Sequence, residues 1–265
     1  MRALAVAMTA ALGLLAACSP APEAPRAVPV PPSTTTTSTT TTPPPPPPKL
    51  FQQPYRYGTA QKEAPPQEGD LAPVVSSIET DKPYVFLTVD DGAVRHPKAL
   101  QLVRDSGIEP SLFLNTTHVQ PDPAYFKALQ GAGAHVHAHT ADHPNLRGMG
   151  YEAQRAQICG NADYLGSALG TRPTLFRPPF GNYDLNTRRA AASCGMRAVV
   201  LWTAAVNDGV VQFQVGDKLR GGDIVLMHFR DSFVADFTAF CERAKADGMT
   251  PVLLDDFLAP PTKRH

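Results

Sequence analysis

The sequence predicts an α/β protein whose main domain is a distorted (β/α)7-like barrel, and three observations lead to this prediction. Short apolar runs rich in β-branched residues alternate with longer segments of helical spacing. Glycine follows several of the helical segments, for example at Gly107, Gly170 and Gly248. Polar motifs stand directly after the apolar runs, where barrel strands carry functional residues. About seven strand-and-helix units fit a barrel better than an open doubly wound sheet.

Each expected strand is a short apolar run that ends at turn residues, and each expected helix carries its apolar residues on one face. In the first helix this face contains Leu100 and Val103, and Pro123 stands in the first turn of the second. Strands are expected over Tyr84–Val89, Ser111–Leu114, His135–His139, Leu175–Arg177, Arg197–Leu201, Ile224–Met227 and Val252–Leu254. Helices are expected over Pro97–Ser106, Asp122–Gln130, Tyr151–Leu169, Asn186–Cys194 and Phe233–Asp247.

Composition limits the possible classes of function. Residues 74–265 are one domain in size and are enough to bury a core without covalent cross-links. The chain has 24 basic and 24 acidic residues, so its formal net charge is zero. This balance gives no electrostatic case for nucleic-acid or anionic-membrane binding. The sequence contains no glycine-rich phosphate-binding motif, so nucleotide binding has no support either.

The first residues are typical of an export signal that ends at a lipidated cysteine. Residues 1–17 carry Arg2 and then an apolar run that is too short to span a membrane, which needs roughly 20 residues. This run leads into Cys18 through Leu-Ala-Ala, which resembles a bacterial lipobox. The alternative is an ordinary signal peptide followed by a chance cysteine. We expect an exported protein that Cys18 anchors by lipid to the outer face of the bacterial cell membrane.

Residues 18–73 are predicted to form a disordered linker ahead of the domain at 74–265. The threonine and proline runs within 34–48 lack the large apolar residues that could offset the entropy of ordering. The proline run favours a semi-rigid polyproline II spacer that rises about 3.1 Å per residue. Near the domain, Phe51, Tyr55 and Tyr57 are candidates to pack on its edge, and no secondary structure is assigned there.

Three cysteines remain when Cys18 is set aside. Outside the cytoplasm they allow one disulfide and one free thiol. We favour the pair Cys159 and Cys194, on successive helical segments, with Cys241 free. The alternative is three buried free cysteines, which pack as small apolar residues. No pair has C-x-x-C spacing, so a zinc–thiolate site is not expected.

Asp90 and Asp91 are adjacent at the end of the first strand of the domain, and Gly92 permits a tight turn after them. Neighbours within a strand point to opposite faces, but at its end the chain is already turning, so both carboxylates can face the barrel mouth. Two ionised carboxylates share a dry site only when a cation joins them. The alternative is an acidic turn in solvent.

His139 and His143 add two imidazoles to this picture. Their spacing places both rings on one side of a helical or tight turn, and with Asp91 they supply three protein ligands for an open zinc site. Surface or capping histidines are the alternative. His137 shares a strand face with His139, and we expect it to pack or to support the ligands rather than to bind metal.

Two further motifs follow later strands. The motif Arg-Pro-Pro-Phe-Gly begins at Arg177 and forms a rigid turn that can aim the N–H of Phe180 as half of an oxyanion hole. Arg177 could also hold Asp90 by a charge-assisted hydrogen bond. Leu226 and His228 share one face of a late strand, and an apolar contact beside an imidazole suits an acetyl methyl group beside a leaving nitrogen. A structural turn, a core leucine and a satisfied histidine are the alternatives.

Together and in this order, the four motifs resemble the NodB-homology polysaccharide deacetylases of carbohydrate esterase family 4. The resemblance covers about Pro83–Leu258. Residues 88–92 match that family's T-F-D-D-G motif with Val89 in place of phenylalanine, and residues 139–144 match H-S/T-x-x-H-P. Residues 177–181 match R-P-P-Y/F-G, and residues 226–228 match L-x-H.

The resemblance implies the NodB-homology barrel and a divalent metal cofactor, Zn²⁺, in its mouth. The implied metal ligands are Asp91, His139 and His143. The resemblance also implies that Asp90 is the catalytic base and His228 the catalytic acid. The N–H of Phe180 and the metal would stabilise the oxyanion, with Arg177 beside the base.

One element of the family pattern is missing. The family's fourth motif usually supplies an aspartate that pairs with the catalytic histidine, and here Ala205 takes its place while Gly209 replaces a tryptophan. Asp208 remains and could partly substitute. Without a carboxylate partner, the pKa of His228 should be less elevated, which predicts weaker activity at neutral and high pH or a different acid.

The expected function is metal-dependent hydrolysis of N-acetyl (or O-acetyl) groups on a cell-wall polysaccharide. Peptidoglycan is the favoured substrate because a lipid tether would face the wall. Trp202 and Leu226 are expected to line the substrate pocket. We expect a monomer that has no nucleic-acid partner and meets the membrane only through its lipid. The alternatives are a carbohydrate-binding lipoprotein with impaired catalysis, which the intact Asp90 and His228 disfavour, and a structural wall-anchoring module.

Overall fold

The structure is a computed structural model that describes residues 48–261. The predicted signal segment, the lipid anchor Cys18 and the linker up to residue 47 lie outside the described residues. The strands are β1 (Val74–Val75), β2 (Tyr84–Asp91), β3 (Ser111–Leu114), β4 (His135–Ala138), β5 (Leu175–Phe176), β6 (Ala198–Val200), β7 (Ala204–Asn207), β8 (Val210–Phe213), β9 (Ile224–His228) and β10 (Thr250–Pro251). The helices are α1 (Ala99–Ser106), α2 (Thr116–Val119), α3 (Pro123–Gln130), α4 (Tyr151–Leu169), α5 (Leu185–Ser193) and α6 (Phe233–Ala246), with 3-10 turns η1 (Pro179–Gly181) and η2 (Leu254–Phe257).

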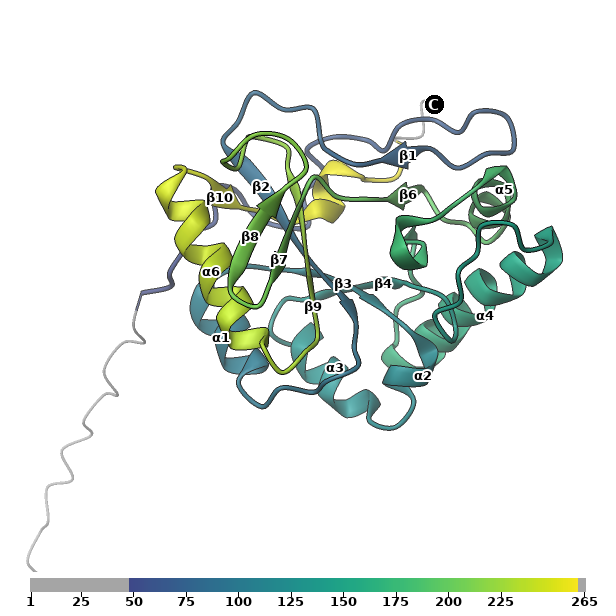
Figure 1. Ribbon diagram of the computed structural model, residues 1–265, viewed down its shortest axis with the longest axis horizontal. Helices are drawn as coiled ribbons and strands as arrows, with labels where there is room; N and C mark the ends of the chain where they lie inside the picture. Colours follow the sequence, from purple (N-terminus) through teal and green to yellow (C-terminus); the bar gives the residue numbers. More distant parts are fainter. Residues whose placement is uncertain (1–47, 262–265) are drawn as a thin grey trace, which may run out of the picture. The chain divides into compact units, whose positions relative to one another are not determined.

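One curled sheet organises these elements, as the predicted fold class requires. Its strand order is β1-β6-β5-β4-β3-β2-β9-β7-β8, with β10 paired to the start of β2. Only the β7–β8 pair is antiparallel among the paired strands. The chain between β6 and β7 joins the two sides of the curl, because Leu201 N–H bonds to the carbonyl of Val75 and Thr203 N–H bonds to that of Ile224. The helices lie around the outside of the sheet (Figure 1). The distorted α/β barrel predicted from the sequence is therefore confirmed.

Strand β2 shows how the sequence sets the two faces of the sheet. Val85, Leu87 and Val89 pack into the core cluster that contains α1, α3 and α6. Phe86 instead joins a cluster inside the curl, and Thr88 beyond it accepts a hydrogen bond from buried Arg177 there. This alternation is the pleat of a strand that is covered on both faces. It continues to Asp90, which therefore points to the interior.

One local prediction was wrong, and one element was missed. The apolar residues Val252, Leu253 and Leu254 were expected to form a strand, but they are buried after β10 has ended, and the chain turns there into η2. The hairpin of β7 and β8 was missed. Asp208 and Gly209 form its turn with φ of 50° and 77°, and Asp-Gly between two apolar runs is a strong hairpin signal.

The described part of the predicted linker, residues 48–73, lies on the domain instead of hanging free. Phe51 is only 8% exposed, and its N–H bonds to Ser106 O at the end of α1. Tyr57 donates its hydroxyl proton to Pro251 O at 2.9 Å. Aromatic residues provide here the apolar area that the preceding proline and threonine runs lack. The folded domain thus begins ahead of the predicted boundary at Val74.

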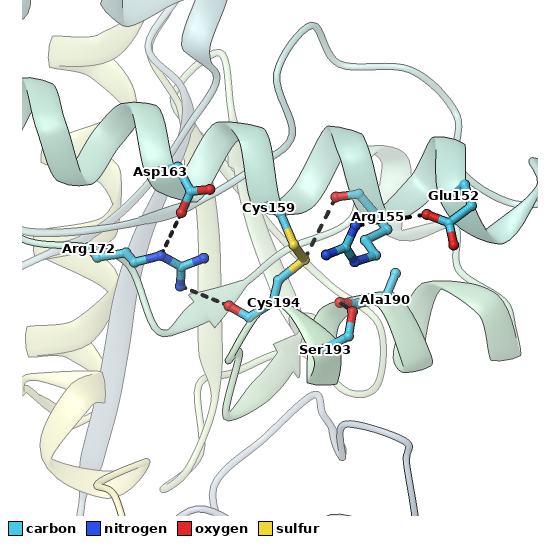
Figure 2. The surroundings of a disulfide bond; sticks show 8 residues. All are labelled: Glu152, Arg155, Cys159, Asp163, Arg172, Ala190, Ser193 and Cys194. Atoms are coloured by element: carbon cyan, nitrogen blue, oxygen red, sulfur yellow. Dashed lines mark hydrogen bonds and ion pairs between the residues drawn. A yellow bond between two sulfur atoms is a disulfide. The ribbon is translucent and has the colours of Figure 1, made fainter.

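A disulfide joins Cys159 in α4 to Cys194 at the end of α5, which is the predicted pair (Figure 2). Arg172 bridges the same two helical segments, because its Nη1 donates to Cys194 O and its Nε donates to Asp163 in α4, each at 2.8 Å. Cys241 is free and buried in α6. None of the helices in the described part of the chain has the length and apolar character that a membrane span requires.

Candidate metal centre and active site

The four sequence motifs meet at the carboxyl ends of neighbouring strands. Asp90 and His228 are direct partners in the register of β2 and β9. His139 follows β4, and Arg177 follows β5. In a curled parallel sheet these ends converge, and this is where such folds place their chemistry.

Asp91, His139 and His143 form the metal-binding group. Asp91 Oδ1 lies 3.4 Å from Nε2 of His139 and 3.4 Å from Nε2 of His143. The three potential ligand atoms lie within 4.8 Å of one another, and no second group of this kind occurs among residues 48–261. Asp91 Oδ1 is buried and has no hydrogen-bond partner. A buried carboxylate oxygen facing two imidazole nitrogens suits a divalent cation, so these three residues fit the implied metal.

The backbone around this group is unusual. Five non-glycine residues among residues 48–261 have positive φ, and four of them belong to the candidate site. These four are Asp91 (φ 76°), Thr140 (φ 74°), His143 (φ 63°) and Phe180 (φ 61°). At Asp91 the positive φ turns the second carboxylate of the pair into the mouth, as the sequence analysis expected. Such conformations persist only where surrounding contacts fix them, and they cluster at functional sites.

His139 is held so that its outer nitrogen faces the metal-binding group. Its Nδ1 lies 2.8 Å from the carbonyl oxygen of Arg177. A carbonyl only accepts, so Nδ1 carries the proton and Nε2 is left as the ligand atom. Burial alone would lower the pKa of His139, but the Asp90 and Asp91 carboxylates raise it above the ordinary value. A bound cation would interact favourably with the same two carboxylates in place of a proton on His139.

The other two members of the group have lowered pKa values. Burial alone would raise the pKa of Asp91, but the neighbouring histidines lower it to about 2, so the carboxyl group is ionised across the physiological range. Burial, and then the charge of His139, lower the pKa of His143. A deprotonated carboxylate and a neutral imidazole are the forms that bind metal.

Asp90 is held by Arg177 in the interior, as the sequence analysis predicted. Asp90 is 2% exposed and Arg177 is 0% exposed. Arg177 Nη1 donates to Asp90 Oδ1 at 2.7 Å and to Thr88 Oγ1 at 2.8 Å. The rest of the guanidinium donates to the carbonyls of Val200 and Leu201 at 3.2 Å. Charge-assisted bonds of this kind fix the orientation of the carboxylate.

His228 has no partner for one ring nitrogen. Its Nδ1 is buried without a hydrogen bond. Burial lowers the pKa of His228, and the Asp90 and Asp91 carboxylates only partly oppose this shift. Ala205, the residue at the place of the missing aspartate, pairs with Leu226 in the register of β7 and β9. Asp208 does not replace that aspartate, because it is an exposed turn residue of the hairpin.

The predicted pocket residues differ in exposure. Phe180 is 63% exposed, and its ring meets the His143 ring edge-on with centroids 4.7 Å apart. Trp202 is partly buried behind the same loop, and a Cβ at Gly181 would come within 3.0 Å of its ring. Leu226 is buried beneath His228. Phe180 thus lies directly beside a member of the metal-binding group, and Trp202 packs behind the loop that carries it.

His137 does not join the metal-binding group, in agreement with the sequence analysis. Its Nε2 lies 3.0 Å from Oδ2 of Asp255 in η2, which is not a member of the metal-binding group. Sequence reasoning assigned no role to three polar residues that support the site: Thr88, Asn115 and Asn161. A buried polar residue within an apolar run, such as Thr88, was the available signal.

Comparison with a family of known proteins covers the first three of the four motifs. The family described as Polysaccharide deacetylase matches residues 77–199. An uncharacterized protein of Streptomyces coelicolor is 43% identical over 185 residues, which cover 68% of this chain and 74% of that relative.

The chain belongs to the polysaccharide deacetylase family. This family comprises hydrolases that remove acetyl groups from polysaccharides.

With more distant polysaccharide deacetylase relatives, this chain matches only part of the relative's length. A peptidoglycan-N-acetylglucosamine deacetylase of Bacillus cereus is 26% identical over 156 residues, and the match covers 56% of each chain. A bifunctional xylanase/xylan deacetylase of Cellvibrio japonicus is 26% identical over 181 residues, which are 65% of this chain and 27% of that protein.

Solved structures show the polysaccharide deacetylase fold. A peptidoglycan N-acetylglucosamine deacetylase superposes with a TM-score of 0.62 at 22% identity, covering 72% of this chain and 95% of that one. A CE4 family pseudoenzyme from Bacillus anthracis gives the same TM-score at 21% identity, covering 72% of this chain and 71% of that one. At these identities the likeness concerns the fold.

Proposed function

We propose that this chain is a divalent-metal-dependent deacetylase that hydrolyses N-acetyl groups on peptidoglycan and uses Zn²⁺. One observation carries the proposal: the unpartnered Asp91 Oδ1 faces His139 and His143 beside an Asp90 carboxylate that Arg177 holds in place. O-linked acetyl groups are chemically accessible to the same arrangement.

The proposed reaction gives each residue of the site one role. A divalent ion held by Asp91, His139 and His143 would polarise the acetyl carbonyl and lower the pKa of a water molecule. Asp90 accepts a proton from the attacking water, and Arg177 keeps that carboxylate oriented. His228 donates a proton to the leaving nitrogen. The N–H of Phe180 donates to the developing oxyanion, and Leu226 and Trp202 line the pocket for the acetyl group.

The proposal of a wall polymer is supported from two directions. The Bacillus cereus relative and the first solved structure compared above are peptidoglycan N-acetylglucosamine deacetylases. Residues 1–17 and Cys18 also have the pattern of an exported lipoprotein. We propose that the domain acts as a monomer on the outer face of the bacterial cell membrane, where peptidoglycan is within reach.

A second candidate function is carbohydrate binding by a lipoprotein with impaired catalysis. The observation that favours it is the buried Nδ1 of His228, which lacks a partner where Ala205 replaces a carboxylate. One solved protein with this fold, from Bacillus anthracis, is a pseudoenzyme. The intact pair of Asp90 and Arg177 favours the enzyme instead.

The test is acetate release together with metal content. The wild-type protein should release acetate from peptidoglycan and from a small acetylated amine, and a chelator should abolish both activities. Asp91→Ala should lose bound zinc and activity together. Retention of the full zinc content by Asp91→Ala would show that the ligand assignment is wrong. Polymer binding without acetate release by the zinc-loaded wild type would favour the impaired lipoprotein.

Ala205→Asp is expected to shift the pH profile of kcat toward higher pH. His228 must be protonated to act as the acid, so activity falls as pH rises through its pKa, which burial lowers. An aspartate at 205 would lie on the strand next to β9, on the face that Leu226 shares with His228. A carboxylate partner raises a histidine pKa by about 1–3 units, so the alkaline limb should move up by about 1 unit or more.

The matched control for this shift is Ala205→Asn, because asparagine has nearly the size of aspartate but carries no charge. If the pH profile of kcat moves equally with both substitutions, the volume of the side chain at position 205, and not its charge, causes the shift. An alkaline limb of the wild type that already lies above that of relatives with the aspartate would contradict the assigned cause.

A further inference from the structure

The loop that joins the two metal-binding histidines has an intrinsically unfavourable backbone conformation. Thr140 and His143 both have positive φ, and a β-branched residue such as Thr140 is a genuine outlier there. Such backbone conformations are strained, so neighbouring contacts must fix the loop. The elements that supply these contacts decide where the His143 ring is held.

The His139 end of the loop is fixed by two buried asparagines. Asn161 in α4 accepts the N–H of His139 at 2.9 Å, and its amide group donates to Leu114 O at 3.1 Å and Thr116 Oγ1 at 3.0 Å. Asn115 donates to the carbonyls of His139 and Thr140. This end therefore has several independent supports.

The His143 end has different supports, and the one that reaches it from helix α4 is the side chain of Gln157. Gln157 Oε1 accepts the N–H of Ala141 at 3.0 Å and that of Asp142 at 3.3 Å. Inside the loop, the N–H of His143 donates to Thr140 Oγ1 at 3.1 Å. The loop carbonyl of Ala141 also accepts the N–H of Thr117 at 3.0 Å.

Helix α4 is a firm base for this contact. Gln154, one turn before Gln157, donates to Asp184 Oδ1 at the start of α5 at 3.1 Å and accepts the hydroxyl proton of Thr187. The disulfide from Cys159 to Cys194 ties the next turn of α4 to the far end of α5 (Figure 2). Gln157 thus projects from a segment that is fixed on both sides.

We propose that Gln157 is a positioning residue for the metal centre, holding His143 in ligand geometry from outside the four motifs. The inference rests on the proposed metal function of Asp91, His139 and His143. The single acceptor oxygen of Gln157 binds the two successive N–H groups before His143, and without it the loop relaxes toward ordinary φ values. His143 then moves away from Asp91, and the metal is held by two residues instead of three.

Titration of the metal-free full domain with Zn²⁺ tests the proposal. Gln157→Ala should raise the Kd for Zn²⁺ by about 10–100-fold, as loss of a residue that orients a metal ligand does. Gln157→Glu keeps the acceptor oxygen and should retain the wild-type Kd within about threefold, a difference that falls well short of this range. At saturating Zn²⁺, kcat of Gln157→Ala should return to the wild-type value. The matched control is Arg155→Ala, an exposed residue of the same helix with only a 3.8 Å ion pair to Glu152.

Three outcomes would overturn the proposal: an unchanged Kd in Gln157→Ala, an equally weakened Kd in Gln157→Glu, and a melting temperature of metal-free Gln157→Ala far below that of Arg155→Ala. The last would make Gln157 a general support of the fold. Failure of the proposed metal centre looks different, because the wild type and Asp91→Ala would then bind Zn²⁺ alike.

Discussion

Asp90→Asn is expected to lower kcat for acetate release by about 10²–10⁴-fold, the usual contribution of a positioned general base. The amide has nearly the shape of the carboxylate, and its oxygen can still accept the 2.7 Å hydrogen bond from Arg177. It cannot take a proton from water at neutral pH. The measurement is kcat on peptidoglycan with the zinc-loaded protein at a fixed pH.

Two controls separate chemistry from structure in this variant. The Kd for Zn²⁺ should change little, because the metal-binding group contains Asp91 and not Asp90. Asp142→Asn, in the loop beside the site, should leave kcat near that of the wild type. A zinc-loaded Asp90→Asn protein with full activity would show that another group is the base.

Arg177→Met is expected to lower the free energy of unfolding by about 3–5 kcal/mol, the usual cost of removing one partner of a buried ion pair. The side chain is 0% exposed and donates to Asp90, Thr88 and two backbone carbonyls. Methionine fills much of the volume but satisfies none of these acceptors. Asp90 would remain as a buried charge with no cation beside it, so activity should fall as well. Urea denaturation of the metal-free protein measures the loss.

The same substitution at an exposed ion pair serves as the control. Arg189 donates to Asp70 at 2.6 Å from a side chain that is 43% exposed, so Arg189→Met should change stability little. Equal losses in the two variants would mean that the buried position of Arg177 has no special role.

The parts of the fold that could be predicted are those with a strong local pattern. The apolar run of β2 and the closing glycine of α4 placed these elements within a few residues. The four motifs could be placed at strand ends because each stands directly after an apolar run. The turn at Asp91 agreed with the sequence because Gly92, with φ of 84°, allows the chain to leave sharply.

The remaining parts depend on contacts between distant segments. The buried run at Val252–Leu254 looks like a strand, but its burial comes from the core around η2 and not from strand pairing. Phe51 and Tyr57 were not assigned structure because their partners, Ser106 and Pro251, lie far along the chain. Gln157 likewise contacts Ala141 and Asp142 of the histidine loop from 16 and 15 residues further along the chain, and no motif marks it.

The free thiol of Cys241 has a practical consequence for making this protein. Cys159, Cys194 and Cys241 can form three different pairs, and only one of them is native. Cys241 is buried in α6 once the chain has folded, but an unfolded chain exposes all three thiols. Production in a reducing cytosol would leave the native pair open, and later oxidation would compete with mispairing. Cys241→Ala removes both wrong pairs and leaves the native bridge as the only one within residues 48–261.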